Sequence, residues 1–86
     1  MAIEVGKPIR DSRGEVERAI DVFTLAAEEA TRIPGEFTSY YSVRRAAGYT
    51  GIVRRFPVGA VSYISPFNFP LNLAAHKIAP AIAVGC

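Results

Sequence analysis

The sequence has 86 residues, of which half are hydrophobic and about a fifth are charged. This length allows one small domain at most, and the composition is that of a globular chain rather than a disordered one. The only cysteine, Cys86, excludes an internal disulfide and predicts a reducing compartment, the cytoplasm. Glu4 and Lys7 interrupt the opening residues, so we expect no secretory signal, and the apolar run 78–84 is too short to span a membrane.

Charge is distributed unevenly along the chain. Residues 1–36 hold all eight acids and five bases, a net charge of −3, whereas residues 37–86 hold five bases and no acid, a net charge of +5. A basic half can form a nucleic-acid surface. Here four of the bases form two short pairs, Arg44-Arg45 and Arg54-Arg55, in β-like segments. We therefore interpret them as a solvated sheet face and predict no nucleic-acid partner.

Residues 11–33 predict one amphipathic helix. It would begin at a capping box, in which the Ser12 hydroxyl and the Glu15 carboxylate satisfy each other's backbone donors, and it would end at Pro34-Gly35. Glu28 and Arg32 are spaced as a favourable ion pair. The predicted buried stripe consists of five apolar residues at helical spacing: Val16, Ile20, Phe23, Ala27 and Ala30.

Residues 36–58 predict two strands. Phe37, Tyr40, Tyr41 and Val43 favour β structure, and the run from 44 to 48 is typical of a break between strands. The second strand would run from 49 to 56 and end at Pro57, because proline cannot donate to a ladder.

The next segment predicts a strand, a tight turn and a helix. Residues 56–64 are apolar and rich in β-branched and aromatic side chains, which is typical of a buried strand. Pro70 stands where the first residue of a helix tolerates proline, and Gly85 fits a C-terminal cap. Open α/β sheets bind ligands just past the carboxyl ends of their strands, where this turn lies. Between Pro70 and Gly85, apolar residues recur at helical spacing: Leu71, Ala74, Ala75, Ile78 and Ile82.

Asn68 is the candidate functional residue of the turn. Its side-chain amide offers two N–H donors and could stabilise negative charge that develops on a substrate oxygen, as an oxyanion hole does. The alternative is a structural role, in which Asn68 caps the helix or closes an Asx-turn. Taken alone, the residue pattern favours the structural role. His76 and Cys86 have no activating partner in the sequence, and no metal site is predicted.

The motifs around Asn68 resemble those of the aldehyde dehydrogenase superfamily. The family's Pro-(Trp/Phe)-Asn-Phe-Pro motif matches residues 66–70, and its Arg-x-Pro-Val-Gly motif matches residues 55–59 at the family's spacing. The opening residues 4–8 resemble the family's Glu-x-Gly-Lys-Pro, and the likeness continues through Lys77-Ile78-Ala79-Pro80. The version with Phe67 most resembles the bacterial and archaeal lactaldehyde or semialdehyde branch.

The resemblance implies an α/β fold, a partial aldehyde dehydrogenase. Residues 1–35 would form an N-terminal segment with an amphipathic helix, and residues 36–58 a β extension used for subunit assembly. Residues 59–86, with the strand Ala60–Ile64, would be the first strand-turn-helix of a Rossmann-like NAD(P)-binding domain.

The resemblance also implies a function. The chain would be a fragment of an NAD- or NADP-dependent enzyme that oxidises an aldehyde to a carboxylic acid through a Cys thioester, and that forms a homo-oligomer in its full-length form. Asn68 would donate to the oxyanion, and Ile64, Ser65, Pro66 and Phe67 would line the nicotinamide-ribose side of the cofactor cleft. The family's nucleophilic Cys and general-base Glu are not represented, so we expect the 86-residue chain alone to be inactive.

Two alternatives are compatible with the residues. One is a non-catalytic fragment of the family that serves assembly or interaction through the strands of 36–58. The other is an unrelated small α+β binding domain that shares the motif by chance. A fragment with an orphan apolar helix is expected to aggregate or to be molten, whereas an independent domain unfolds cooperatively.

Overall fold

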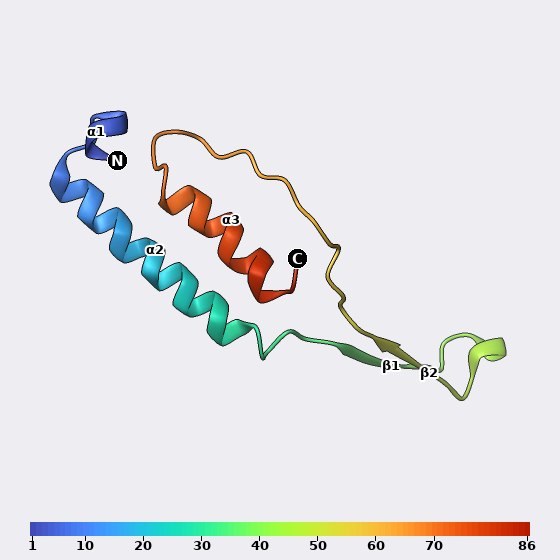
Figure 1. Ribbon diagram of the computed structural model, residues 1–86. Helices are drawn as coiled ribbons and strands as arrows, with labels where there is room; N and C mark the ends of the chain where they lie inside the picture. The colour runs from blue at the N-terminus through green and yellow to red at the C-terminus, as the bar shows by residue number, and fades with distance from the viewer.

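The computed structural model describes residues 1–86 and contains three helices and one β-hairpin (Figure 1). α1 (Ala2–Val5) is a single turn, α2 (Ile9–Glu29) is the longest helix, and α3 (Asn72–Ala83) ends the chain. β1 (Glu36–Tyr40) and β2 (Tyr49–Val53) lie between α2 and α3 in the sequence. This order of helix, β extension, turn and helix agrees with the predicted partial α/β fold. None of the helices combines the length and the apolar composition that a membrane-spanning helix requires.

α2 begins at Ile9 rather than at residue 11, and it ends at Glu29. Its N-cap residue is Pro8, whose fixed φ of −52° directs the chain into the helix. Ser12 and Glu15 consequently lie inside the helix, and the predicted capping box is not formed. The ion pair between Glu28 and Arg32 is confirmed, with 3.8 Å between Oε2 and Nη2.

The predicted apolar stripe of α2 is wrong, because a different face of the helix packs against α3. Four of its five residues are exposed, and only Ala30 is half-buried. The buried face of α2 carries Ser12, Glu15 and Ala19, and the facing side of α3 carries Asn72, Ala75 and Ala79. Ser12 and Ala19 are small and let the two helices approach closely, and Glu15 accepts the Leu71 and Asn72 N–H groups at the start of α3. These contacts favour this face over the more hydrophobic one.

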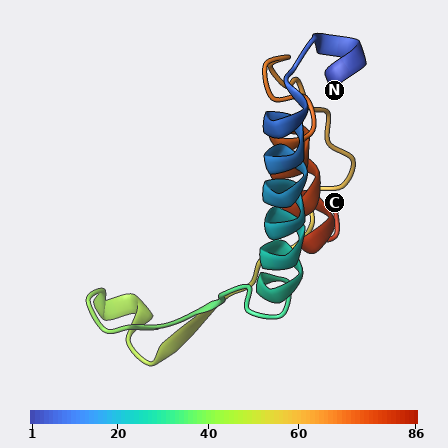
Figure 2. The ribbon, with the colours of Figure 1, turned by 90° about the vertical axis from the view of Figure 1, so that its left-hand side faces the viewer.

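The two strands form an antiparallel hairpin that extends away from the helix pair (Figures 1 and 2). Glu36 pairs with Val53 and Tyr40 pairs with Tyr49. A short 3-10 turn lies at Arg44–Ala46 inside the connection, and β2 ends at Val53, before the predicted end at residue 56. Every strand residue except Gly51 is exposed.

The predicted strand Ala60–Ile64 is not formed. Residues 54–66 run from the hairpin back to the start of α3 without regular secondary structure (Figure 1). No backbone–backbone hydrogen bond involves residues 54–68. A strand is defined by its ladder to a neighbour, and no strand pairs with this segment, because the one ladder of the structure joins β1 to β2. The composition of a buried strand is present, but its partners are not.

α3 ends at the predicted glycine cap. Gly85 has a φ of +83°, its N–H donates to the Ile82 carbonyl at 3.0 Å, and the Cys86 N–H donates to the Ala81 carbonyl at 2.9 Å. This pair of bonds is the Schellman arrangement, which satisfies the last carbonyls of a helix.

The buried core is confined to the contact between α2 and α3. Only six of the 86 residues are buried, and the buried hydrophobic ones are three alanines. The radius of gyration is 19.8 Å, whereas a compact chain of this length has about 12 Å. The molecule is therefore a pair of helices with a long arm.

Candidate functional site

The turn at residues 66–70 joins the returning segment to α3 and carries Asn68. Asn68 and Phe67 are exposed, and the Asn68 side chain forms no hydrogen bond within the protein. The N-cap residue of α3 is Leu71, and no side chain of the turn caps the helix. The Asn68 side chain therefore neither caps α3 nor closes an Asx-turn, the two structural roles considered for it, and the amide lies free at the surface.

The four residues predicted to contact a cofactor directly precede Asn68. Ile64 and Phe67 are 90% and 84% exposed, and Ser65 is half-buried. The backbone of this stretch has no backbone partner, although the Ile64 carbonyl accepts a hydrogen bond from the Lys77 ammonium group.

A buried carboxylate, which the sequence pattern did not single out as functional, lies at the start of α3. Glu15 is 2% exposed. Its Oε1 accepts the N–H groups of Leu71 and Asn72 at 2.8 and 2.9 Å, and its Oε2 accepts the Lys7 ammonium at 2.5 Å. The first N–H groups of a helix have no intrahelical partner, and a carboxylate is their most favourable acceptor. Glu15 of α2 therefore caps α3, more than fifty residues away in the sequence.

Glu15 is held in its charged form by these contacts. Burial alone would raise the pKa of Glu15, because a carboxylate loses its hydration inside a protein. The hydrogen bonds from Lys7, Asn72 and Leu71, together with the Lys7 charge, outweigh burial and lower the pKa below its ordinary value. Glu15 is thus an anion at neutral pH, and Lys7 is its counter-charge.

The same lysine contacts the turn from its other side. The Lys7 ammonium lies 3.8 Å from the centroid of the Phe69 ring, and the Arg18 guanidinium lies 6.0 Å from it. Cations are attracted to the faces of aromatic rings at these distances. Phe69, next to Asn68, is therefore fixed by the elements that hold the start of α3. These groups line an open hollow of about 440 Å³ formed by Lys7, Arg10, Asp11, Gly14, Glu15, Arg18 and Phe69.

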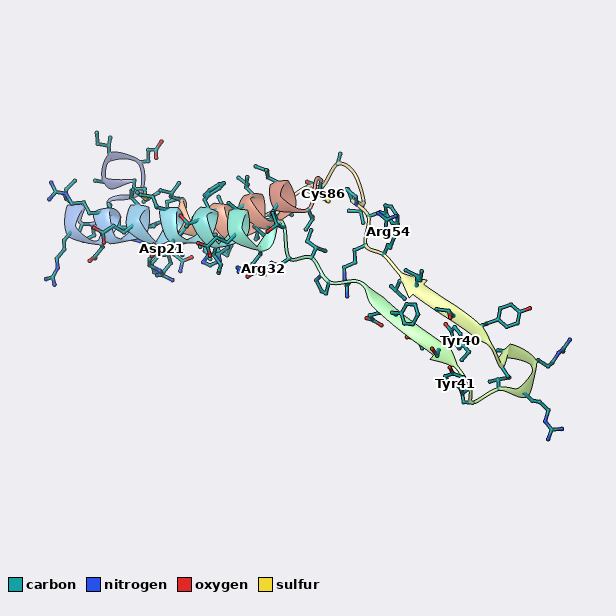
Figure 3. The ribbon with its side chains drawn as sticks, turned by 90° about the horizontal axis from the view of Figure 1, so that it is seen from below. Asp21, Arg32, Tyr40, Tyr41, Arg54 and Cys86 are labelled. Carbon is teal, nitrogen blue, oxygen red and sulfur yellow. The ribbon has the colours of Figure 1, made fainter.

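Other reactive side chains do not join this group. The His76 side chain is exposed and forms no hydrogen bond. Nowhere do three or more His, Cys, Asp or Glu side chains come together in a group that could hold a metal ion. Cys86 is a free, half-buried thiol. It lies where the end of α3 meets the returning segment, far from Tyr40 and Tyr41 on the hairpin (Figure 3).

Comparison with known proteins gives the family. The model of the aldehyde dehydrogenase family matches residues 1–86. The chain is 48% identical over 85 residues to 3-sulfolactaldehyde dehydrogenase of Priestia aryabhattai, covering 99% of this chain and 18% of that protein. It is 48% identical over 90 residues to lactaldehyde dehydrogenase of Methanocaldococcus jannaschii, covering 99% and 17%. It is 46% identical over 82 residues to sulfoacetaldehyde dehydrogenase of Neptuniibacter caesariensis, covering 95% and 18%.

The chain therefore spans less than a fifth of the length of these relatives. The match nevertheless runs through the whole chain, from the opening Gly-Lys-Pro to the end of α3, and includes the turn with Asn68. On the residues that it contains, the chain belongs to the aldehyde dehydrogenase family.

Proposed function

We propose that these residues are the N-terminal part of an NAD(P)-dependent aldehyde dehydrogenase that oxidises an aldehyde to a carboxylic acid through a Cys thioester. The nucleophilic Cys and the general-base Glu would come from residues outside 1–86. The aldehydes named for the relatives, lactaldehyde, 3-sulfolactaldehyde and sulfoacetaldehyde, are the first substrates to test. Because the chain has a single cysteine, we further propose a reducing compartment, the cytoplasm.

The observation that carries this proposal is the free amide of Asn68. It lies at the surface of a turn whose following helix is already capped by Glu15, so its two N–H donors have no structural task within the chain. An amide with uncommitted donors, in a turn next to a helix start, suits the stabilisation of an oxyanion.

In the proposed mechanism, attack of the Cys on the aldehyde places negative charge on the carbonyl oxygen, and the Asn68 side chain donates a hydrogen bond to it. The bound NAD(P)⁺ supplies the hydride acceptor. Ile64, Ser65, Pro66 and Phe67 would contact the nicotinamide-ribose side of this cofactor, largely through backbone atoms.

The test is Asn68→Ala in the full-length protein, with Ser62→Ala, an exposed residue of the same segment, as the matched control. Loss of one oxyanion donor lowers kcat by about 10²–10³. The dissociation constant of the cofactor, measured by fluorescence quenching, should stay unchanged, because Asn68 is not expected to contact the cofactor. A kcat for Asn68→Ala equal to that of the control would refute the assignment.

We also propose that the hairpin β1–β2 contributes to a homo-oligomer. This is supported by its position away from the helix pair and by the exposure of its apolar side chains, with Phe37 at 73% and Ile52 at 70%. Sedimentation velocity of the full-length Ile52→Lys variant should show a smaller assembly than the wild type. An unchanged sedimentation coefficient would exclude this face from the subunit contact.

A further inference from the structure

One charged side chain fixes the start of α3, and this side chain comes from another helix. Glu15 uses both of its oxygens, one for the N–H groups of Leu71 and Asn72 and the other for Lys7. The first turn of α3 has no acidic residue of its own and no capping side chain. The position of the helix start is therefore set by a contact with α2.

The contact reaches the turn through Phe69. The Lys7 ammonium that pairs with Glu15 also lies on the Phe69 ring, at 3.8 Å from its centroid. At the other end of the turn, the Lys77 ammonium holds the Ile64 carbonyl. Asn68 lies between these two fixed points, and it is the adjacent residue Phe69 that the Lys7–Glu15 pair contacts.

A buried ion pair is a poor way to gain stability, because the desolvation of two charges offsets their attraction. Apolar residues of similar volume would join α2 to α3 at least as well. A carboxylate, in contrast, accepts two backbone N–H groups in a fixed geometry and so places a backbone segment accurately. Accuracy is what an oxyanion donor needs, since a misplacement of about 1 Å can lower a rate by about a hundredfold.

We propose that Glu15, with Lys7 as its counter-charge, is a positioning residue that sets the place of the Asn68 amide through Leu71, Asn72 and Phe69. This inference rests on the proposed role of Asn68. It assigns to α2 a part in the reaction although no residue of α2 reaches the substrate.

The experiment is a double-mutant cycle in the full-length enzyme between Glu15→Ala and Asn68→Ala. Glu15→Ala alone should lower kcat by about tenfold to a hundredfold and leave the cofactor dissociation constant unchanged. In the Asn68→Ala background the same substitution should lower kcat by less than about twofold, because the group that Glu15 positions is already gone. The matched control is Glu17→Ala, an exposed acid on the same helix, which should keep the wild-type kcat.

Glu15→Gln gives a second, milder variant that keeps an acceptor for the two N–H groups and loses the charge towards Lys7. It should retain more kcat than Glu15→Ala while its circular dichroism spectrum stays near that of the wild type. If Glu15→Ala does not fold, the cycle is measured with Glu15→Gln, and the expected coupling with Asn68→Ala is the same.

The outcomes separate the two proposals. If Asn68→Ala keeps the wild-type kcat, the proposed function of the turn fails, and this inference fails with it. If Asn68→Ala lowers kcat but the Glu15 substitution lowers it by the same factor in both backgrounds, Asn68 keeps its role and Glu15 is merely structural. Only a Glu15 effect that disappears in the Asn68→Ala background supports positioning.

Discussion

Expression of residues 1–86 on their own should give a chain without cooperative tertiary structure. The reason is the size of the core, which consists of Ala19, Ala75 and Ala79 among six buried residues. Burial of three methyl groups contributes about 2–3 kcal/mol, at about 0.8 kcal/mol each. A stable domain needs a net free energy of unfolding of about 5–15 kcal/mol, so this core is too small before any opposing term is considered.

The assay combines differential scanning calorimetry, near-ultraviolet circular dichroism of the four tyrosines, and binding of the dye ANS. We expect a broad heat-capacity trace, a weak near-ultraviolet signal and strong dye binding, because apolar side chains such as Ile20, Phe37 and Ile52 are exposed. The full-length protein is the control and should show sharp transitions with little dye binding.

One result would refute this reasoning. A single cooperative transition of the isolated chain, with an unfolding enthalpy of about 60 kcal/mol, would show that residues 1–86 form a core of their own. It would favour an independent small domain over a segment completed by further chain, and the exposure of the α2 stripe and of the hairpin would then need another explanation.

Three further results are expected in the full-length protein. The pKa of Glu15 is lowered in the folded protein, so the charged carboxylate stabilises the fold. This stabilisation should be complete above the ordinary carboxyl pKa of about 4.3 and should be lost as the pH falls through the lowered folded value. The acid unfolding curve of Glu15→Gln should lack this pH-dependent loss, and a curve identical to that of the wild type would contradict the prediction. Ala79→Leu overfills the contact between α2 and α3 and should lower the free energy of unfolding by about 1–3 kcal/mol. Glu17→Ala, at an exposed polar position of α2, should change it little in a denaturant titration. Gly85→Ala should lower the melting temperature, because φ at this residue is +83° and the added Cβ would lie 3.1 Å from the Pro57 ring. Gly14→Ala should raise the melting temperature, because Gly14 lies inside α2 with open space around it.

Local signals predicted several features of this chain. The break between the strands, the stop of α2 before Pro34 and the cap at Gly85 depend on proline, glycine and β-branched residues, whose preferences act within a few residues. The family motifs placed Asn68 in a turn before a helix, and the structure has this turn. These features could be predicted from the sequence because their causes are local.

The buried face of α2 could not be predicted from hydrophobicity alone. The stripe with Ile20 and Phe23 is the more apolar face, but α3 packs on the face with Glu15 and Ala19. One signal could have revealed it: an acid in phase with a row of small residues, Ala19, Val22 and Ala26, marks a close helix contact that contains a charge. The partner of that charge could not be read from spacing, since Leu71 and Asn72 lie more than fifty residues further along.

The failed strand prediction has the same kind of cause. The composition of residues 60–64 favours a strand in the middle of a sheet, but a strand forms only when neighbouring strands complete its hydrogen-bond ladder. None is present beside it, so its backbone groups are left unpaired. Propensity was therefore correctly read, and the secondary structure still did not follow from it.

Two of the three family motifs, those at residues 4–8 and 66–70, are far apart in the sequence but meet in space. Lys7 of the opening Gly-Lys-Pro lies on the ring of Phe69 from the turn motif and also donates a hydrogen bond to Glu15, which accepts the Leu71 N–H. Pro8 starts α2 immediately after this lysine, which places Glu15 two helical turns further on, at the start of α3. The start of α3, directly after the turn that contains Asn68, is therefore held by residues near the other end of the chain.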